Sequence, residues 1–467
     1  MSTQAAAPAA AANNIQASPW PTFWIASIAV LLVSIDTTVL YAAFGALRQG
    51  FPDGSAADLS WVLNAYTVTY AAMLIPAGGL ADVHGRKRMF LLGAAIFLIG
   101  SAACGAAGSI TLLIAARVVQ AVGAALLTPA SLSLILDAFP QNKRAVAVSL
   151  WGAVGGMAAA IGPSLGSFIV DSMGWQWAFY INLPIGAVSL VLGYARLQES
   201  RIPGKVQHVD LVGMALLVVS VGAAAMALTQ FESPGWSRGT IEAAAVTAAV
   251  TLFAFVAWAA RARHPLVDLN LFRSPTYSAV NLATLSFAMA FSMMFFAFFS
   301  YMTTIWHYSL PLAGIAVTPG PLLVVPTAII SGRVAARLGH RPGLVIGSVV
   351  YAASGLWLAL VPGTSPAYWT EWFPGLVLSG IGVGMVLPSL SGAATAKLPQ
   401  NQYGVGSAVN QAVRQIGSVL GVALTVMLIG HEGLARADFT HLYSLHAALA
   451  LITGMFCLLV NTRPSAR

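Results

Sequence analysis

Charged residues are scarce in this chain. Asp, Glu, Lys and Arg together make up 8% of its 467 residues, whereas ordinary soluble proteins contain roughly 25%. Only two cysteines are present, Cys104 and Cys457, and each lies within an apolar run. Because two isolated thiols form neither a disulfide framework nor a metal site, we expect no metal and no redox chemistry.

The sequence also lacks the local signatures of ATP-driven and metal-dependent chemistry. It contains no Gly-x-x-x-x-Gly-Lys phosphate loop and no His-Glu-x-x-His pair, and these are the motifs that cradle phosphate and bind catalytic zinc. We therefore expect no enzyme activity and no cofactor. Any energy that this chain uses must come from a source other than ATP, such as an ion gradient.

Long apolar runs are what the chain has in abundance. The hydrophobic fraction is 58% and the mean hydropathy is +0.81. A helix that crosses a bilayer needs about 20 mostly apolar residues, and the short alternating segments of a membrane barrel are absent. The sequence predicts an all-α membrane protein with fourteen spans near 22–47, 59–81, 89–108, 110–136, 145–170, 176–196, 209–230, 240–260, 276–304, 311–335, 342–362, 370–395, 404–430 and 441–461.

The positions of the basic residues predict the orientation of these spans. Seventeen of the 22 Lys and Arg residues follow even-numbered spans, and basic residues gather on the cytoplasmic side of a membrane. We therefore expect a multi-pass protein of the inner (plasma) membrane with both termini in the cytoplasm, including a disordered N-terminal tail (1–21) and a short C-terminal tail (462–467). The net charge of +8 reflects this topology, so no nucleic-acid binding is expected.

A polar hinge between the second and third spans recurs in the second half of the chain. Residues 78–88 read Gly-Gly-Leu-Ala-Asp-Val-His-Gly-Arg-Lys-Arg, and residues 331–341 repeat the glycine spacing and the basic end. Pro-Gln-Asn at 140–142 likewise recurs at 399–401. Such repeats are typical of transporters made of two related bundles. The predicted domains are an N-terminal six-helix bundle (22–197), two inserted helices (209–261) and a C-terminal six-helix bundle (276–461).

With this hinge and this plan of six, two and six spans, the whole chain resembles the major facilitator superfamily, specifically its fourteen-helix drug:proton antiporter branch. The second hinge departs from the pattern, because Ala336 stands where Asp82 would be. The resemblance implies a multidrug efflux transporter that works by alternating access. It would export hydrophobic, cationic drugs or toxic compounds in exchange for protons, acting as a monomer in the lipid bilayer.

Three alternatives remain open at this point. The chain could instead export one endogenous metabolite, such as an antibiotic or a siderophore, and substrate breadth would separate the two exporters. It could import a nutrient, or it could be a membrane receptor or scaffold that transports nothing.

Asp36 and Arg117 are the first candidates for the functional site. Asp36 lies about 21 Å along the first span at 1.5 Å per residue, well inside a hydrocarbon core about 30 Å thick. A carboxylate there must face water, find a partner or take up a proton, as a proton-coupled carrier requires. Arg117 lies within the fourth span, and the resemblance implies a role in proton transfer or cavity electrostatics. Structural pairing is the alternative for both residues.

The fifth span carries small residues four apart. Gly152, Gly156, Gly162 and Gly166 clear one helix face, and Pro163 removes a backbone donor and can kink the helix. This face resembles the Gly-Pro motif of antiporters in the superfamily, which implies export. Ordinary helix packing is the alternative.

Two further groups of residues complete the prediction. Asp82, Gly85, Arg86 and Asp137 are expected to form a cytoplasmic gate, with Asp82 facing a second-half helix and Arg86 pairing with Asp137, as the family pattern implies. The alternative is that the bases of the hinge only fix topology. Residues of the possible substrate cavity, each of which has a purely structural role as its alternative, are Asn64, Tyr66, Phe295, Asn410 and Arg414.

Overall fold

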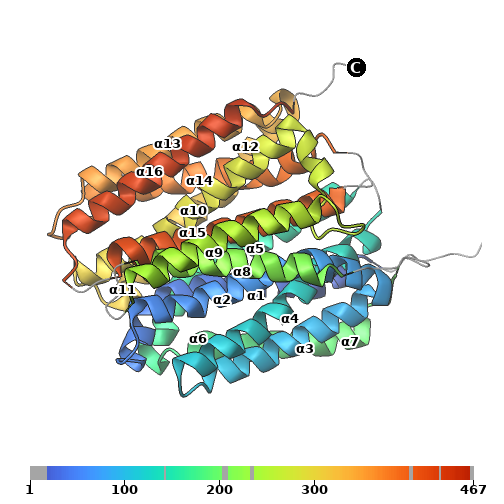
Figure 1. The fold of residues 1–467 in the computed structure, drawn as a ribbon, viewed down its shortest axis with the longest axis horizontal. Helices are drawn as coiled ribbons and strands as arrows, with labels where there is room; N and C mark the ends of the chain where they lie inside the picture. Colours follow the sequence, from blue (N-terminus) through green and yellow to red (C-terminus); the bar gives the residue numbers. More distant parts are fainter. Residues whose placement is uncertain are drawn as a thin grey trace, which may run out of the picture.

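The structure is a computed structural model. It describes residues 18–140, 143–201, 209–231, 236–398, 403–430 and 433–462. Most of the predicted N-terminal tail, nearly all of the C-terminal tail and most of both Pro-Gln-Asn segments lie outside these ranges. The described residues form helices and connecting loops, without strands (Figure 1).

The helices of the first part of the chain are α1 (Trp20–Gly50), α2 (Ala56–His84), α3 (Arg86–Gly105), α4 (Ile110–Ala138), α5 (Arg144–Met173), α6 (Trp177–Tyr180) and α7 (Asn182–Arg196). We refer to α1–α7 as the first half. Two helices follow, α8 (Leu211–Thr229) and α9 (Arg238–Ala259). The second half comprises α10 (Pro275–Thr304), α11 (Leu310–Val317), α12 (Pro319–Leu338), α13 (Arg341–Leu360), α14 (Phe373–Thr395), α15 (Tyr403–Ile429) and α16 (Arg436–Leu458).

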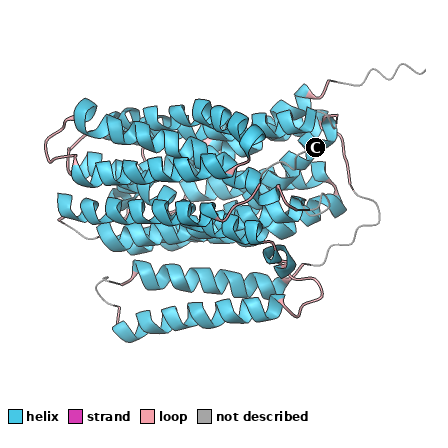
Figure 2. Cartoon of the chain, turned by 90° about the horizontal axis from the view of Figure 1, so that it is seen from above, coloured by secondary structure: helices cyan, strands magenta, loops and turns pink. Residues whose placement is uncertain are grey.

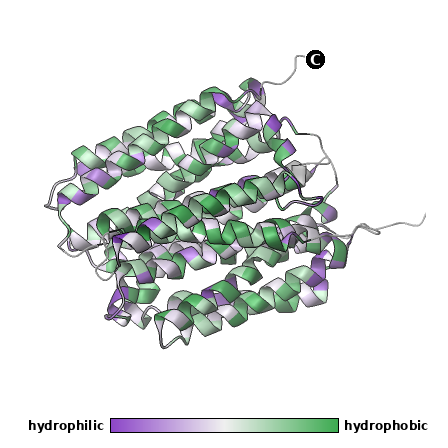
Figure 3. Cartoon of the chain, in the orientation of Figure 1, coloured by the Kyte–Doolittle hydropathy of each residue, from purple (hydrophilic) through white to green (hydrophobic). Residues whose placement is uncertain are grey.

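Most of these helices are long and apolar enough to cross a membrane. Twelve candidate spans lie among the described residues, and α2 and α5 add two more helices of 29 and 30 residues. The predicted sixth span is divided into α6 and α7, and the predicted tenth span into α11 and α12. Many large apolar side chains are exposed. Hydrophilic residues gather toward the helix ends (Figure 3). The chain is a multi-pass membrane protein.

Both predicted hinges have the same backbone feature. Gly85 between α2 and α3 has φ 109°, and Gly339 between α12 and α13 has φ 80°. Side-chain-bearing residues rarely adopt these angles, which explains a glycine at each position. We call the end of the bundle that carries these two glycines the hinge end, and the other end the far end.

The two halves share one apolar core away from the hinge end. Its buried first-half members come from the middle or the far end of their helices, and they pack with residues of α10 to α16. Aromatic contacts cross between the halves at this level, with Tyr41 near Phe295 and Phe44 near Phe296 (ring centroids 6.1 and 4.6 Å apart). Among the described residues, the core cluster at the hinge end of the first half contains first-half residues alone. The halves are therefore joined in the middle and at the far end of the bundle, including the packing of α2 on α15.

Helices α8 and α9 lie on one face of the bundle. Figure 2 shows this pair beside the other helices, and the same pair lies in front in Figure 1. The α8 helix packs on α2 and α15, so it bridges the two halves, whereas α9 contacts α8 and buries little else. The contact between the two halves is therefore made mainly by helices other than α8 and α9.

Candidate functional site

Asp36 and Arg117 form an ion pair inside the first half. The Arg117 Nη1 atom donates to the Asp36 Oδ2 atom at 2.7 Å, and each side chain is only 1% exposed. The two residues come from α1 and α4 and are 81 positions apart in sequence. Both residues are predicted site residues, and the fold brings them together.

Three neutral groups complete the polar network around this pair. The Asp36 Oδ1 atom accepts hydrogen bonds from Gln120 Nε2 at 2.8 Å and from Asn182 Nδ2 at 2.9 Å. Arg117 also donates to the carbonyl oxygen of Val62 at 3.0 Å and to Gln120 Oε1 at 2.6 Å. A buried ion pair is tolerated when its remaining donors and acceptors are satisfied in this way. The carboxylate of Asp36 is therefore held as a counter-ion of Arg117.

A stack of aromatic rings leads from this pair toward the second half. The guanidinium carbon of Arg117 lies 4.0 Å from the centroid of the Tyr66 ring, a cation–π geometry. Tyr66 stacks on Tyr70, with centroids 6.0 Å apart and an interplanar angle of 12°. The Tyr70 hydroxyl donates to Thr128 at 3.2 Å, and Arg414 of α15 also lies near this tyrosine. The aromatic pair thus runs from the buried ion pair along α2, which packs against α15 of the second half.

The other predicted cavity residues do not form one group. Asn410 donates to Asn281 and Thr284 of α10, at 3.1 and 2.9 Å, within the second half. Phe295 packs against Tyr41 and lines a separate apolar cavity of about 60 Å³ between α10, α12 and α14. The hydrogen bonds of Asn410 tie α15 to α10, and a contact of Asn410 with substrate stays a prediction. Asn64 is buried, and neither its amide nitrogen nor its oxygen has a hydrogen-bond partner among the described residues.

At the hinge end, the predicted partner of Arg86 is present. Arg86 pairs with Asp137 at the end of α4 and also with Asp82, at 2.9 Å. The backbone N–H groups of Lys87 and Arg88 donate to the carboxylate of Glu199 at 3.0 and 3.1 Å. That acid caps the N-terminal end of α3, where a negative charge is favoured. A contact of Asp82 with a second-half helix stays a prediction.

Glu199 also explains the glycine at position 85. A Cβ atom at Gly85 would lie 2.6 Å from the carboxylate of Glu199. Glu199 is not among the site residues predicted from the sequence, because its partners are 112 and 111 positions away. The sequence feature that could have indicated its role is the position of an acid directly after the sixth predicted span.

The small-residue face of α5 packs against α1 and α11. A Cβ atom at Gly166 would lie 2.9 Å from the Cα atom of Val39, and one at Gly162 would overlap the hydroxyl of Thr38. Pro163 lies within the helix between these glycines. Gly152, in contrast, has nothing within 4 Å of an added Cβ atom, which corrects the expectation of close packing there. The surroundings of Gly156 lie outside the described residues.

The same region of α5 also contacts the second half. Ser164 donates to the carbonyl oxygen of Gly314 in α11 at 3.2 Å and is hydrogen-bonded to Thr318. A Cβ atom at Gly314 would overlap the hydroxyl of Ser167. The predicted motif region therefore contacts α1, which carries Asp36, on one side and the second half on the other.

The two bundles of apolar helices and their buried central ion pair are those of a membrane transporter. A family model described as Major Facilitator Superfamily matches residues 26–422 and 280–467. The chain belongs to this superfamily.

Curated relatives point to one branch of it. The chain is 32% identical to the "Tetracenomycin C resistance and export protein" of Streptomyces glaucescens, over 90% of this chain and 77% of the relative. It is 31% identical to the "Multidrug resistance protein Stp" of Mycobacterium tuberculosis, over 85% of this chain and 73% of the relative. These relatives confirm the predicted resemblance to drug-efflux members of the superfamily.

The fold is also that of solved transporters. A D-xylose-proton symporter superposes with a TM-score of 0.66, over 96% of this chain and 98% of the other. Its sequence identity is 15%, so this likeness concerns the fold alone.

Proposed function

We propose that this protein is a proton-coupled exporter of lipophilic drugs or antibiotics that works by alternating access. Fourteen spans, namely the twelve candidates with α2 and α5, would carry the chain across the plasma membrane. The hinge end would face the cytoplasm, since most basic residues lie there. No cofactor takes part, and the proton gradient supplies the energy.

The Asp36–Arg117 pair is the observation that carries this proposal. It is a titratable acid with its counter-ion, buried between apolar helices. Ionisable groups at this depth mark proton and ion pathways. A proton taken up by Asp36 would cancel the attraction to Arg117 and release the guanidinium, so the network has two electrostatic states. A carrier needs such a difference to couple proton binding to a change of conformation.

Contacts between the halves support a cycle of alternating access. The shared core, the Tyr41 and Phe44 contacts and the Ser164 hydrogen bond all lie toward the far end. We infer a state that is closed outside and opens toward the cytoplasm. Because α5 touches both α1 and α11, a shift at Asp36 can reach the contact between the halves through α1 and the tightly packed Gly162 and Gly166.

The names of the relatives support two kinds of export function. One relative is named for multidrug resistance and the other for resistance to a single antibiotic and its export. A broad drug exporter is the first candidate, with recognition of cations retained as a prediction. A dedicated exporter of an endogenous antibiotic is the second, favoured by the tetracenomycin C relative.

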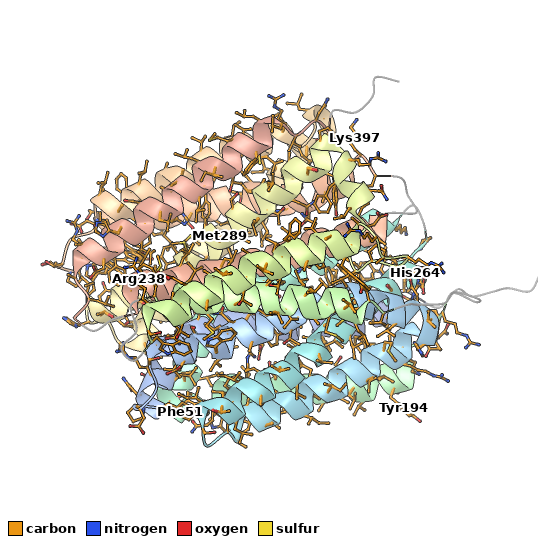
Figure 4. All side chains as sticks on the ribbon, viewed as in Figure 1. Phe51, Tyr194, Arg238, His264, Met289 and Lys397 are labelled. Atoms are coloured by element: carbon orange, nitrogen blue, oxygen red, sulfur yellow. The ribbon has the colours of Figure 1, made fainter. Side chains whose placement is uncertain are left out.

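Reconstituted liposomes test the proposal. A pH-sensitive dye is trapped inside, a proton gradient is imposed, and lipophilic compounds are added to wild type and to Asp36→Asn. Substrate-dependent proton flux is expected in wild type and in the control Arg238→Gln, which lies at the far end (Figure 4) and removes an exposed arginine that pairs with Glu242. The flux should disappear in Asp36→Asn. Coupled flux that survives in this variant would place the proton site elsewhere, and no flux with any compound would refute the transport function.

A further inference from the structure

Arg414 is a base near the middle of α15 without a counter-ion. It donates no hydrogen bond and joins no ion pair within the described part of the chain, although its side chain is half-buried. Burial disfavours a charged group, and α15, which carries Arg414, packs against α2, which carries Tyr70. An arginine at membrane depth requires an acceptor, and the described residues do not provide one at this position.

Arg414 belongs to a polar face of α15. Ser407, Gln411, Arg414 and Ser418 recur at the spacing of one helix face, and each is half-buried or exposed. This helix packs against α2 of the first half. Gln411 and Arg414 both lie close enough to Tyr70 to act on its hydroxyl. The free guanidinium therefore lies at the contact between the halves, where a substrate of an alternating-access carrier binds.

The charge balance of this region is positive. Asp36 is the carboxylate near the middle of the described spans, and it is taken up by Arg117. The other described Asp and Glu residues lie at helix ends or in loops, so none of them lies beside Arg414 near the middle of α15. With two arginines and one aspartate, the middle of the described spans has one positive charge in excess while Asp36 is ionised.

We propose that Arg414 binds an acidic group, a carboxylate or an acidic phenol, of the exported compound. This inference rests on the proposed export function and narrows its substrate class. The planar guanidinium matches a carboxylate in a bidentate arrangement. Gln411 and Tyr70 add neutral hydrogen-bonding groups beside it, and the apolar helices around them receive the rest of the molecule. Substrates would then be lipophilic acids, in addition to any neutral compounds.

Binding of a matched series of probes tests this assignment. Pyrenebutyric acid, its methyl ester and pyrenebutyl trimethylammonium share one aromatic body and differ in charge. Energy transfer from the tryptophans to pyrene reports the dissociation constant in detergent. The variants are Arg414→Gln, Arg414→Lys and the control Arg238→Gln, whose exposed arginine lies at the far end of the bundle.

Wild type should bind the acid at least about 10-fold more tightly than the ester, which is the size of one charge-assisted hydrogen bond. Arg414→Gln should weaken binding of the acid by about 10- to 100-fold and leave the ester unchanged. Arg414→Lys should fall between the two, because it keeps the charge and loses the bidentate fork. The control should bind all three probes as wild type does.

Three results would overturn the proposal. The first is a wild type that shows no preference for the acid, a measurement that needs no variant. The second is an equal loss of acid and ester in Arg414→Gln, which would indicate a structural role. The third is displacement of the acid by phosphatidylglycerol at matched concentration, which would assign Arg414 to a lipid headgroup.

Measurements of proton-coupled flux distinguish a failure of this inference from a failure of the proposed export function. If Arg414→Gln still exchanges the methyl ester for protons but not the acid, both proposals stand. If wild type exchanges the ester but not the acid, the exporter stands and the acid site is refuted. If wild type prefers the acid in binding but moves no probe, the proposed export function fails on its own.

Discussion

Removing either member of the Asp36–Arg117 pair should destabilise the protein strongly, and removing both should cost less than the two losses added together. Asp36→Asn leaves a fully buried guanidinium without its counter-ion, and Arg117→Gln leaves a carboxylate that retains only the Gln120 and Asn182 donors. Breaking a buried pair from one side costs about 3–5 kcal/mol. The double variant has no unpaired charge, so we expect a coupling energy of about 2 kcal/mol or more, near the upper part of the range for residues in contact.

The two cysteines provide the assay. Cys104 and Cys457 are free and fully buried, so a thiol-reactive dye reports unfolding of the detergent-solubilised protein as they become accessible. Each single variant should lower the unfolding temperature by several degrees, and the double variant should recover part of that loss. Arg238→Gln should leave it unchanged, because its partner is exposed and such pairs contribute little. Additive losses in the double variant would refute the reasoning that the pair acts as one unit.

Three further predictions use the same dye or the flux assay. Gly85→Ala should destabilise the protein by about 1–3 kcal/mol, because φ is 109° and the added Cβ would meet Glu199. The matched control Gly152→Ala lies in open space within a helix, so it should be neutral or stabilise by up to about 1 kcal/mol, and an equal loss in both variants would contradict this explanation. Gly166→Val should abolish substrate-dependent proton flux, because the added side chain would separate α5 from the α1 backbone, whereas Gly152→Val should keep this flux. Normal flux in both variants would show that the contact between α5 and α1 is dispensable. Burial lowers the pKa of His340 below its ordinary value of 6.5, so the unfolded state binds the proton more readily than the folded state does. The contribution of His340 to stability should therefore be complete above pH 6.5 and fall as the pH drops below it. His340→Gln should flatten this pH dependence of the unfolding temperature, and an unchanged slope would assign the loss to other groups.

Site residues could be predicted from the sequence where their side chains differ in polarity from the residues around them or recur at a fixed spacing. Asp36 and Arg117 stand out because a charge within an apolar run is costly, and the hinge glycines stand out because they recur at one spacing. The pairing of Arg86 with Asp137 came from the family pattern and is present. Helix existence was also readable from apolar length, as in the predicted span 59–81 and the observed α2.

The remainder depends on packing between distant segments. Gln120 and Asn182 are neutral, so no local penalty marks them, and Asn182 reaches Asp36 across 146 positions. Glu199 is one acid among several at helix ends until the fold places it against α3. The hydrogen bonds of Asn410 to α10 were likewise not readable from the sequence, because a polar side chain in a span can serve a neighbouring helix as well as a ligand.

The charge of the substrate decides how the membrane potential acts on this exporter. Asp36 is the single carboxylate near the middle of the described spans, so one proton per cycle is the simplest stoichiometry. Exchange of one proton for a monocation moves no net charge and depends on the pH difference alone. Exchange for a monoanion moves two charges, so a potential of 100 mV contributes about 4.6 kcal/mol at about 2.3 kcal/mol per charge. An acid bound by Arg414 would therefore be exported against a steeper concentration gradient than a cation that uses the same proton.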